Sequence, residues 1–232
     1  MEVPFCFPKA GAHREKIRYQ KRVIDCATLI AIGIDENGKR EILGTSVKLS
    51  EQEIHWREFL QNLQTRGLHG IELITSDAHA GLKAAKTAVF PSVPWQRCQF
   101  HLQQNAQKYV PKKSMKEDVA FDIRAIFNTS SQTEAERLLN LTAEKYRQQA
   151  PDLANWMVDN LPESFTVFTF PKNHWKKIRT SNIAERLNRE IKKRTRVVGI
   201  FPNMASCERL TSAILLEFCE TWQMEDKYLD VS

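Results

Sequence analysis

The run CATLIAIGI at positions 26–34 constrains the fold more than any other stretch of the chain. It is apolar throughout and rich in residues that favour strands, which is typical of a strand buried on both faces. It is far shorter than the ~20 residues that a membrane-spanning helix requires. A strand of this kind needs helices packed over it, so the sequence predicts a sheet flanked by helices.

Turn and cap signals divide the rest of the first hundred residues. Asn37-Gly38 predicts a hairpin that returns through a second strand at 40–49. Ser50 and Glu53 have the spacing of a capping box and predict the start of a helix. A strand, a helix and a short strand are then expected at 70–77, 80–90 and 94–101. Strands alternating with helices favour an α/β fold with a mixed sheet.

Beyond residue 101 the pattern changes to helices. Two further capping boxes, Ser114/Glu117 and Ser131/Glu134, occur in this block. Helices are also expected near 182–196 and 204–222. We therefore divide the chain into three segments: a core at 1–101, a helical insertion at 102–170, and the completion of the core at 171–232.

Composition narrows the class of protein. The chain has 34 basic and 28 acidic residues, a formal charge of +6, which favours an anionic partner. Its five cysteines include no CxxC pair, which argues against a disulfide framework or a four-cysteine zinc site. The N-terminus has no apolar core of the kind found in signal peptides. We expect a cytoplasmic protein with no membrane partner.

The positive charge is concentrated in residues 172–196. This stretch has ten basic and two acidic residues, so its local charge of +8 exceeds that of the whole chain. Ile183, Leu187 and Ile191 form a packing stripe on the helix expected there, and Glu185 lies on another face with cations. Such a face is either solvated with local ion pairs or delivers a metal-binding carboxylate into a phosphate-binding groove.

Asp77 raises the same question at the end of an expected strand, in TSDAHAGLKAA. It is either a helix cap or a metal ligand, and one carboxylate alone does not decide between them.

Several longer motifs point to one family. SDAHAGLKAA, WQRCQFH, FPKNHWKKIRTSNIAERLNREIKKRTRVVGIFPN and RLTSAILLE resemble the mutator-type transposases of bacterial insertion sequences. The resemblance implies a ribonuclease-H-like fold, an Asp-Asp-Glu triad, and an all-helical insertion before the last catalytic helix. It also implies Mg²⁺ or Mn²⁺ as cofactor. By motif match, Asp77 is the second carboxylate and Glu185 the third, and Cys98 and His101 form the Cys-x-x-His signature.

The resemblance also implies partners. Family members act on DNA, in this case the ends of an insertion element and its target, and a homo-oligomer or a complex with full-length transposase is a further expectation. The residues that we expect to contact DNA are Lys176, Lys177, Arg179, Arg186, Arg189, Lys192, Lys193, Arg196, His174 and Trp175.

The first carboxylate of the triad is missing. Family members have a segment like LDARYEKVR, whereas residues 9–18 read KAGAHREKIR and place Gly11 at the catalytic position. Glu15, Asp25 and Asp35 lack the motif context to replace it. We expect an N-terminally truncated chain with a degraded first strand near 1–18 and no catalysis of its own. The alternatives are a fragment that inhibits by binding DNA or transposase, and an inert relic.

Three other residues have two interpretations each. Cys98 and His101 either bind a metal or have a structural role near the active site. Trp156 is either an ordinary core residue of the helical block or a platform on which a flipped base stacks.

Overall fold

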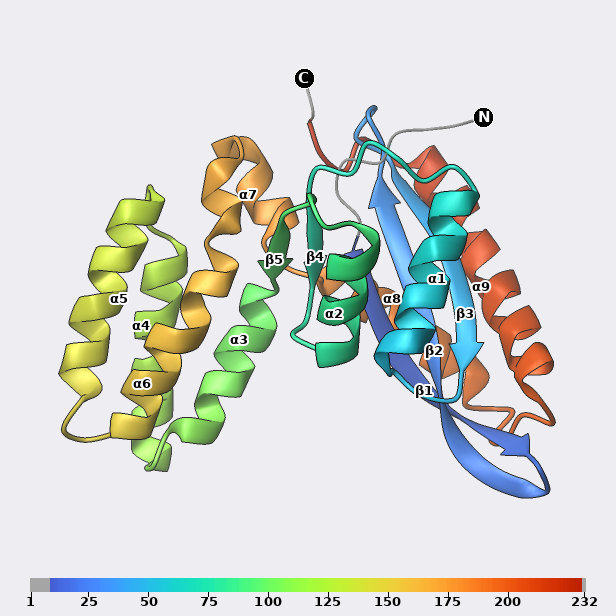
Figure 1. Ribbon diagram of the computed structural model, residues 1–232, viewed down its shortest axis with the longest axis horizontal. Coiled ribbons are helices and arrows are strands. Elements are labelled where there is room, and N and C mark those ends of the chain that lie inside the picture. The colour runs from blue at the N-terminus through green and yellow to red at the C-terminus, as the bar shows by residue number, and fades with distance from the viewer. Residues whose placement is uncertain (1–8, 231–232) are drawn as a thin grey trace. The chain divides into compact units, whose positions relative to one another are not determined.

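The computed structural model describes residues 9–230, whose strands and α-helices are labelled in Figure 1. These residues form two compact units. The first contains the chain up to Pro94 and again from Ser181 onward, and the second contains Trp95–Thr180. The helical insertion predicted at 102–170 therefore lies inside the second unit, which is wider than the prediction at both ends.

The first unit combines strands and helices. Its strands are β1 (Lys9–Tyr19), β2 (Arg22–Ile34), β3 (Arg40–Lys48) and β4 (Ile74–Ser76), and its helices are α1 (Glu53–Thr65), α2 (Ala80–Val89), α8 (Asn182–Thr195) and α9 (Met204–Met224). The hairpin turn predicted at Asn37-Gly38 joins β2 to β3, and Gly38 has the positive φ that such a turn requires.

The second unit is mainly helical. It contains β5 (Trp95–Arg97), α3 (Gln99–Ala106), α4 (Lys116–Phe127), α5 (Gln132–Tyr146), α6 (Pro151–Asn160) and α7 (Lys172–Ile178), with 3₁₀ turns η1 (Gln107–Tyr109), η2 (Lys113–Met115), η3 (Leu161–Ser164) and η4 (Thr166–Thr169). Buried apolar side chains of α3 to α6 form its core. Across residues 9–230, no helix has both the length and the apolar character needed to cross a bilayer.

Strand β1 corrects one expectation. The sequence predicts a degraded first strand near 1–18. Residues 1–8 of that range lie outside the described part of the chain, but residues 9–19 form a strand between β2 and β4 in the order β3-β2-β1-β4. β1 pairs antiparallel with β2 from Lys9↔Ile32 to Tyr19↔Arg22, and parallel with β4 at Lys9↔Thr75. Because it pairs with β2 along its whole described length, the strand forms despite a glycine and several charged residues. The prediction of a mixed sheet is confirmed.

Helices cover both faces of this sheet. Ile30 and Ile32 of β2 pack in one cluster with residues of α8 and α9. Gly44 of β3 lies on the opposite face, since its partner is Ala31, and a Cβ there would meet Leu63 and Phe59 of α1. Figure 1 accordingly draws α1 in front of the sheet and α8 behind it.

The predicted helix starts were right in part. Ser131 accepts a hydrogen bond from the Glu134 backbone N–H and caps α5, as expected. Glu53 is the first residue of α1, whose N-cap is Gln52, and α4 begins at Lys116 after a 3₁₀ turn, so the other two capping boxes do not form. Asn203 and Ser206 instead make an unpredicted capping box at the start of α9.

Candidate active site

Asp77 lies directly after β4, whose three residues are buried. Helix α2 begins three residues later with His79 as its N-cap, so Asp77 does not cap this helix. The Asp77 side chain is half-buried, and within residues 9–230 its carboxylate makes no hydrogen bond or ion pair. A strand end that holds a carboxylate without a structural partner leaves it available to a ligand.

Gly11 lies on β1, the strand that pairs with β4 just before Asp77. β1 and β4 run parallel and pair at Lys9↔Thr75, and two residues further along each strand come Gly11 and Asp77. Residues two apart on a strand share a face, so Gly11 is on the same face of β1 as Lys9, while Asp77 follows the last residue of β4. A Cβ on Gly11 would lie 3.7 Å from Ala184 Cβ and 3.7 Å from Asn188 Nδ2. Position 11 therefore faces α8 at the turn that carries Glu185.

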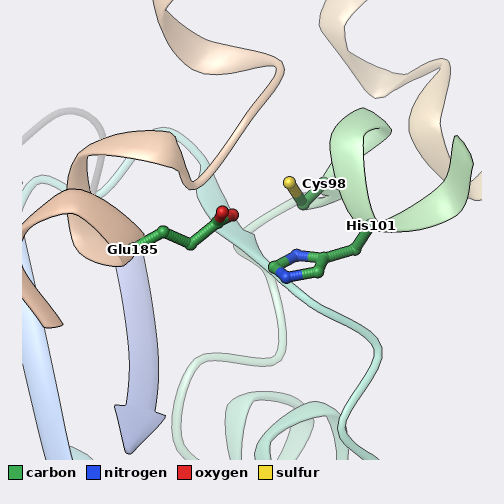
Figure 2. A group of neighbouring side chains, drawn as sticks. All are labelled: Cys98, His101 and Glu185. Atoms are coloured by element: carbon green, nitrogen blue, oxygen red, sulfur yellow. The ribbon is translucent and has the colours of Figure 1, made fainter. Parts of the chain in front are cut away.

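Glu185 lies in the first turn of α8. The predicted stripe of Ile183, Leu187 and Ile191 is buried, which fixes the orientation of the helix on the sheet. The Ser181 hydroxyl donates to Glu185 Oε1 at 3.2 Å, and the Glu185 backbone N–H donates to the Ser181 carbonyl. The positive end of the helix dipole favours a carboxylate in this turn. Figure 2 shows the Glu185 side chain extending from the start of α8.

Of the three positions that the resemblance assigns to the triad, position 11 packs against α8 and lies on the strand that pairs with β4, and it has no donor. Mg²⁺ and Mn²⁺ prefer oxygen ligands, and a pair of such ions needs carboxylates that can bridge or flank both. Asp77 and Glu185 supply two carboxylates, and Gly11 supplies none. The side chains present do not fit a two-metal centre.

The carboxylates considered as substitutes are engaged elsewhere. Glu15 is four residues along β1 from Gly11, and its Oε1 accepts from Thr195 Oγ1 at 2.7 Å and lies 3.3 Å from His13 Nε2. Burial raises the pKa of Glu15, but the bonds from His13 and Thr195 and the charges of His13 and Lys192 hold that pKa below its usual value.

Asp25 is opposite Lys16, near the hairpin end of the sheet. Asp35 accepts the Asn37 and Lys39 backbone N–H groups at 3.0 and 2.7 Å in the β2–β3 turn.

Sequence reasoning missed a polar link between β1 and α8. His13 is only 5% exposed, and its Nδ1 lies 3.0 Å from Asn188 Oδ1. His13 shares a face with Gly11 because the two are two residues apart, and Asn188 follows Glu185 by three residues on α8. The alternation of β1 was the only local signal for His13, and it required the strand itself to be recognised.

The basic stretch divides between the units. On α8 the side chains of Arg186, Arg189, Lys192 and Lys193, followed by Arg196, are exposed, as the sequence predicts. Lys193 pairs with Glu190 at 2.7 Å and Arg194 pairs with Glu217, so these two charges are partly neutralised within the unit. The exposed cations of α8 are consistent with a surface that contacts phosphate.

The side chains that α7 contributes to the basic stretch are less accessible to a DNA partner than expected. His174 is 7% exposed, and the Trp175 indole N–H donates to the Phe170 carbonyl at 2.7 Å while its ring packs edge-on against Phe168. Arg179 donates to Asn128 Oδ1 at 2.9 Å, and burial lowers its pKa. Lys176 stays exposed and Lys177 is half-buried. Contact of these residues with DNA stays a prediction, and the packing of His174 leaves that side chain little free surface for it.

Cys98 and His101 occupy the start of α3. Cys98 is the N-cap residue and is fully buried, and His101 follows in the first turn with its ring against Phe100. Figure 2 shows the thiol and the imidazole extending to the same side of this turn. A structural zinc ion takes four ligands, so this pair does not complete such a site by itself.

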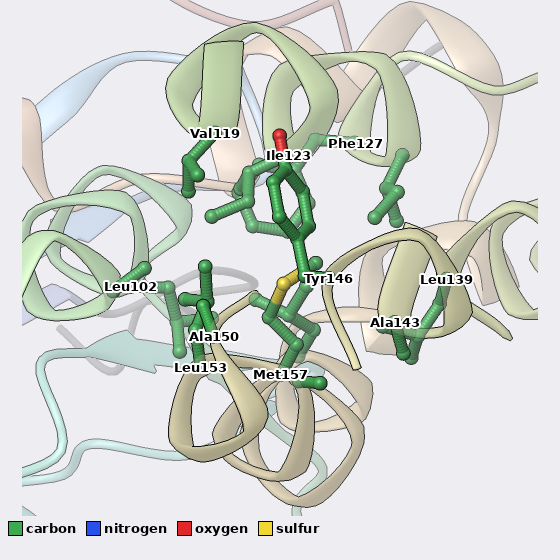
Figure 3. Packing of buried hydrophobic residues seen from close by; sticks show 14 of the residues in the cluster. Leu102, Val119, Ile123, Phe127, Leu139, Ala143, Tyr146, Ala150, Leu153 and Met157 are labelled. Atoms are coloured by element: carbon green, nitrogen blue, oxygen red, sulfur yellow. The ribbon is translucent and has the colours of Figure 1, made fainter. Parts of the chain in front are cut away.

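Trp156 packs against the core of the second unit, part of which is drawn in Figure 3. Its ring stacks on that of Tyr109, with centroids 5.4 Å apart and planes 25° apart. Half-buried and stacked on a protein ring, Trp156 fits the core interpretation, while base stacking stays a prediction.

Comparison with known proteins shows the family of the chain. The family model described as "Transposase, Mutator family" matches residues 1–225. The chain is 51% identical over 229 residues to the transposase for insertion sequence element IS406 of Burkholderia multivorans, covering 99% of this chain and 58% of the relative. It is 40% identical over 230 residues to the transposase for IS1081 of Mycobacterium tuberculosis, covering 97% of this chain and 54% of the relative. The chain thus spans a little over half the length of these relatives.

A solved structure shares the fold. The Drosophila P element transposase strand transfer complex aligns with a TM-score of 0.50 and 10% identity, covering 90% of this chain and 76% of that chain. This likeness confirms the predicted ribonuclease-H-like class.

Proposed function

The chain belongs to the Mutator family of transposases, and we propose that it is the catalytic-domain portion of an insertion-element transposase that binds DNA without cutting it. The observation that carries the second half of this proposal is Gly11. It lies on the strand that pairs with β4 just before Asp77, faces the turn of α8 that bears Glu185, and has no side chain to offer a metal ion.

The chemistry explains why one missing carboxylate matters. Strand cleavage and transfer are in-line displacements at phosphorus, and bound Mg²⁺ ions supply the activation of the attacking oxygen and the neutralisation of the leaving one. Asp77 and Glu185 would hold one hard cation with water completing its shell, because Mg²⁺ keeps several waters. The third position is needed to fix a second cation, and at Gly11 it is absent.

Binding of DNA depends on other residues. The exposed cations of α8 project from a helix that is fixed by its buried stripe, so they are positioned independently of any metal ion. A protein with these cations and an incomplete metal centre binds DNA without cleaving it. We therefore also propose that it competes with an intact transposase for the same DNA, as an inhibitor would.

The test is metal-dependent strand cleavage. Purified chain is incubated with Mn²⁺ and supercoiled plasmid carrying the insertion-element ends. We expect the unaltered chain to nick the plasmid no more than Asp77→Ala does. Gly11→Asp should nick the plasmid, and the double variant Gly11→Asp/Asp77→Ala should not. Robust Mn²⁺-dependent cleavage by the unaltered chain, abolished by Asp77→Ala, would show that the site is competent and the proposal wrong.

A further inference from the structure

The far end of the β1–β2 hairpin carries positive charge that the predicted basic stretch does not include. We call residues 16–25 the arm; it contains Lys16, Arg18, Lys21 and Arg22 against one acidic residue, Asp25. All four cations are exposed. In Figure 1 the arm extends beyond the other elements of its unit, at the lower right of the view. Its charge is thus presented to solvent.

Among the described residues, the four arm cations have no protein partner. Within residues 9–230, no carboxylate forms an ion pair with any of the four, and no hydrogen bond engages their side chains. Arg14, just below the arm, differs because it lies 3.9 Å from Glu51. Exposed cations that repel one another are costly unless an anion neutralises them.

The base of the arm is rigid. Ile17 is fully buried in a cluster with Cys26, Val47, Phe201 and Cys207. Phe201 also pairs with the strand: the Arg18 N–H donates to the Phe201 carbonyl at 2.8 Å, and the Phe201 N–H donates to the Lys16 carbonyl at 2.9 Å. Because β-strand side chains alternate, burial of Ile17 fixes Lys16 and Arg18 together on the opposite, exposed face.

The same pairing joins the arm to the segment that follows α8. Phe201 ends the stretch from Arg196 to Ile200, all of it exposed, with Val197 at 88% and Ile200 at 43%. Thr195, the last residue of α8, bonds to Glu15 at the base of the arm. The cations of α8 and those of the arm are therefore connected through one fixed piece of backbone.

The turn of the arm places a lysine, Lys21, in a left-handed backbone conformation that lysine does not favour. Gln20 and Lys21 have φ of 47° and 65°, the left-handed region that a two-residue hairpin turn requires and that Asn-Gly adopts most readily. A lysine at this position costs conformational energy relative to glycine. Local folding preferences do not explain Lys21, whereas an interaction of its charge with a partner would.

We propose that the arm is a second DNA-contacting element, in which Lys16, Arg18, Lys21 and Arg22 bind backbone phosphates of the same duplex that the α8 cations contact. This proposal rests on the proposed function for DNA binding and names a site within it. A two-stranded β-ribbon has dimensions that the major groove of B-DNA admits, so the partner that fits best is double-stranded DNA.

The experiment measures how binding depends on salt. A fluorescein-labelled duplex is titrated with the full chain at several KCl concentrations, and log K is plotted against log salt. Each lost phosphate contact reduces the slope by about 0.9. We expect Lys16→Gln/Arg18→Gln to reduce the magnitude of the slope by about 2. Lys112→Gln/Lys113→Gln removes two exposed cations of the second unit and should leave the slope unchanged.

A turn variant separates charge from folding. Gln20→Asn/Lys21→Gly provides the favoured turn sequence while it removes one cation, so we expect an unchanged or higher thermal midpoint and a slope smaller by about 1. The proposal that the arm contacts DNA would be wrong if both arm variants kept the slope of the unaltered chain while Arg189→Gln/Lys192→Gln reduced it. DNA binding through α8 would then still hold. Salt-independent binding by the unaltered chain would contradict both the arm proposal and the proposed DNA-binding function.

Discussion

His13 Nδ1 and Asn188 Oδ1 lie 3.0 Å apart, which joins the strand that carries Gly11 to the helix that carries Glu185. The bond is between residues 175 positions apart, and the imidazole is almost entirely shielded from solvent. It therefore holds the strand of Gly11 and the helix of Glu185 together. Loss of the amide would leave a buried ring nitrogen without this partner.

The first prediction concerns this bond. Asn188→Ala should lower the free energy of unfolding by about 1–3 kcal/mol, the cost of a buried polar group that loses its partner. Urea denaturation followed by circular dichroism measures it. Asn182→Ala is the matched control, because Asn182 is exposed on the same helix. Equal stability of the two variants would mean that the His13–Asn188 contact contributes nothing to the fold.

The second prediction concerns pH. The pKa of Glu15 is below its usual value in the folded chain, so the folded state favours the ionised carboxylate more than the unfolded state does. Its contribution to stability is then present above the unfolded pKa and is lost as pH falls through the lower, folded pKa. We expect Glu15→Gln to be less stable than the unaltered chain at neutral pH, and the difference to shrink in acid. A difference that stays constant from neutral pH to below pH ~4 would contradict this linkage.

Local patterns predicted the elements whose signals lie within a few residues. The Asn37-Gly38 turn, the helices near 182–196 and 204–222, and the stripe of Ile183, Leu187 and Ile191 are all present. Strand β1 was missed because its signals are not local. Lys9, Gly11 and His13 are poor strand residues, and the strand exists because β2 pairs with it from Lys9 to Tyr19 and β4 pairs with it at Lys9.

The candidate site divides in the same way. Motif resemblance points to Asp77, Glu185 and position 11 as the site, and these assignments stay predictions. Their arrangement follows from the parallel pairing of Lys9 with Thr75 and from the packing of Ala184 and Asn188 over position 11. Both are contacts between residues far apart in sequence, which periodicity and cap signals do not encode. The same holds for the link between the arm and Phe201.

The third prediction uses two serines to which the sequence assigns the same role. Ser131 caps α5 by accepting the Glu134 N–H, whereas Ser114 lies in a 3₁₀ turn before α4 and caps no helix. Ser131→Ala should cost about 1 kcal/mol. Ser114→Ala should stay within about 0.5 kcal/mol of the unaltered chain. Both residues belong to the second unit, so one urea transition compares them. Equal losses would mean that the cap contributes no stability.

The last prediction restores the missing carboxylate. A Cβ at position 11 meets only ordinary contacts, at 3.7 Å from Ala184 Cβ and Asn188 Nδ2, so Gly11→Asp should fold. Its carboxylate would face α8 beside Asp77 and complete the set of oxygen donors with Glu185. We expect Mn²⁺ to bind Gly11→Asp more tightly than the unaltered chain, as titration by electron paramagnetic resonance would show. Binding should stabilise the variant by about 2.7 kcal/mol at a hundredfold excess of Mn²⁺ over Kd.

Two variants complete the design. Gly11→Ala adds the Cβ without the carboxylate and should bind Mn²⁺ no better than the unaltered chain, which separates the donor from its steric effect. Gly11→Asp/Asp77→Ala should lose the gained affinity, because two carboxylates at a site bind a hard cation less well than three. Circular dichroism shows whether Gly11→Asp folds. If it folds and still binds no more Mn²⁺ than Gly11→Ala, position 11 does not belong to the metal site. The glycine is then not what leaves that site incomplete.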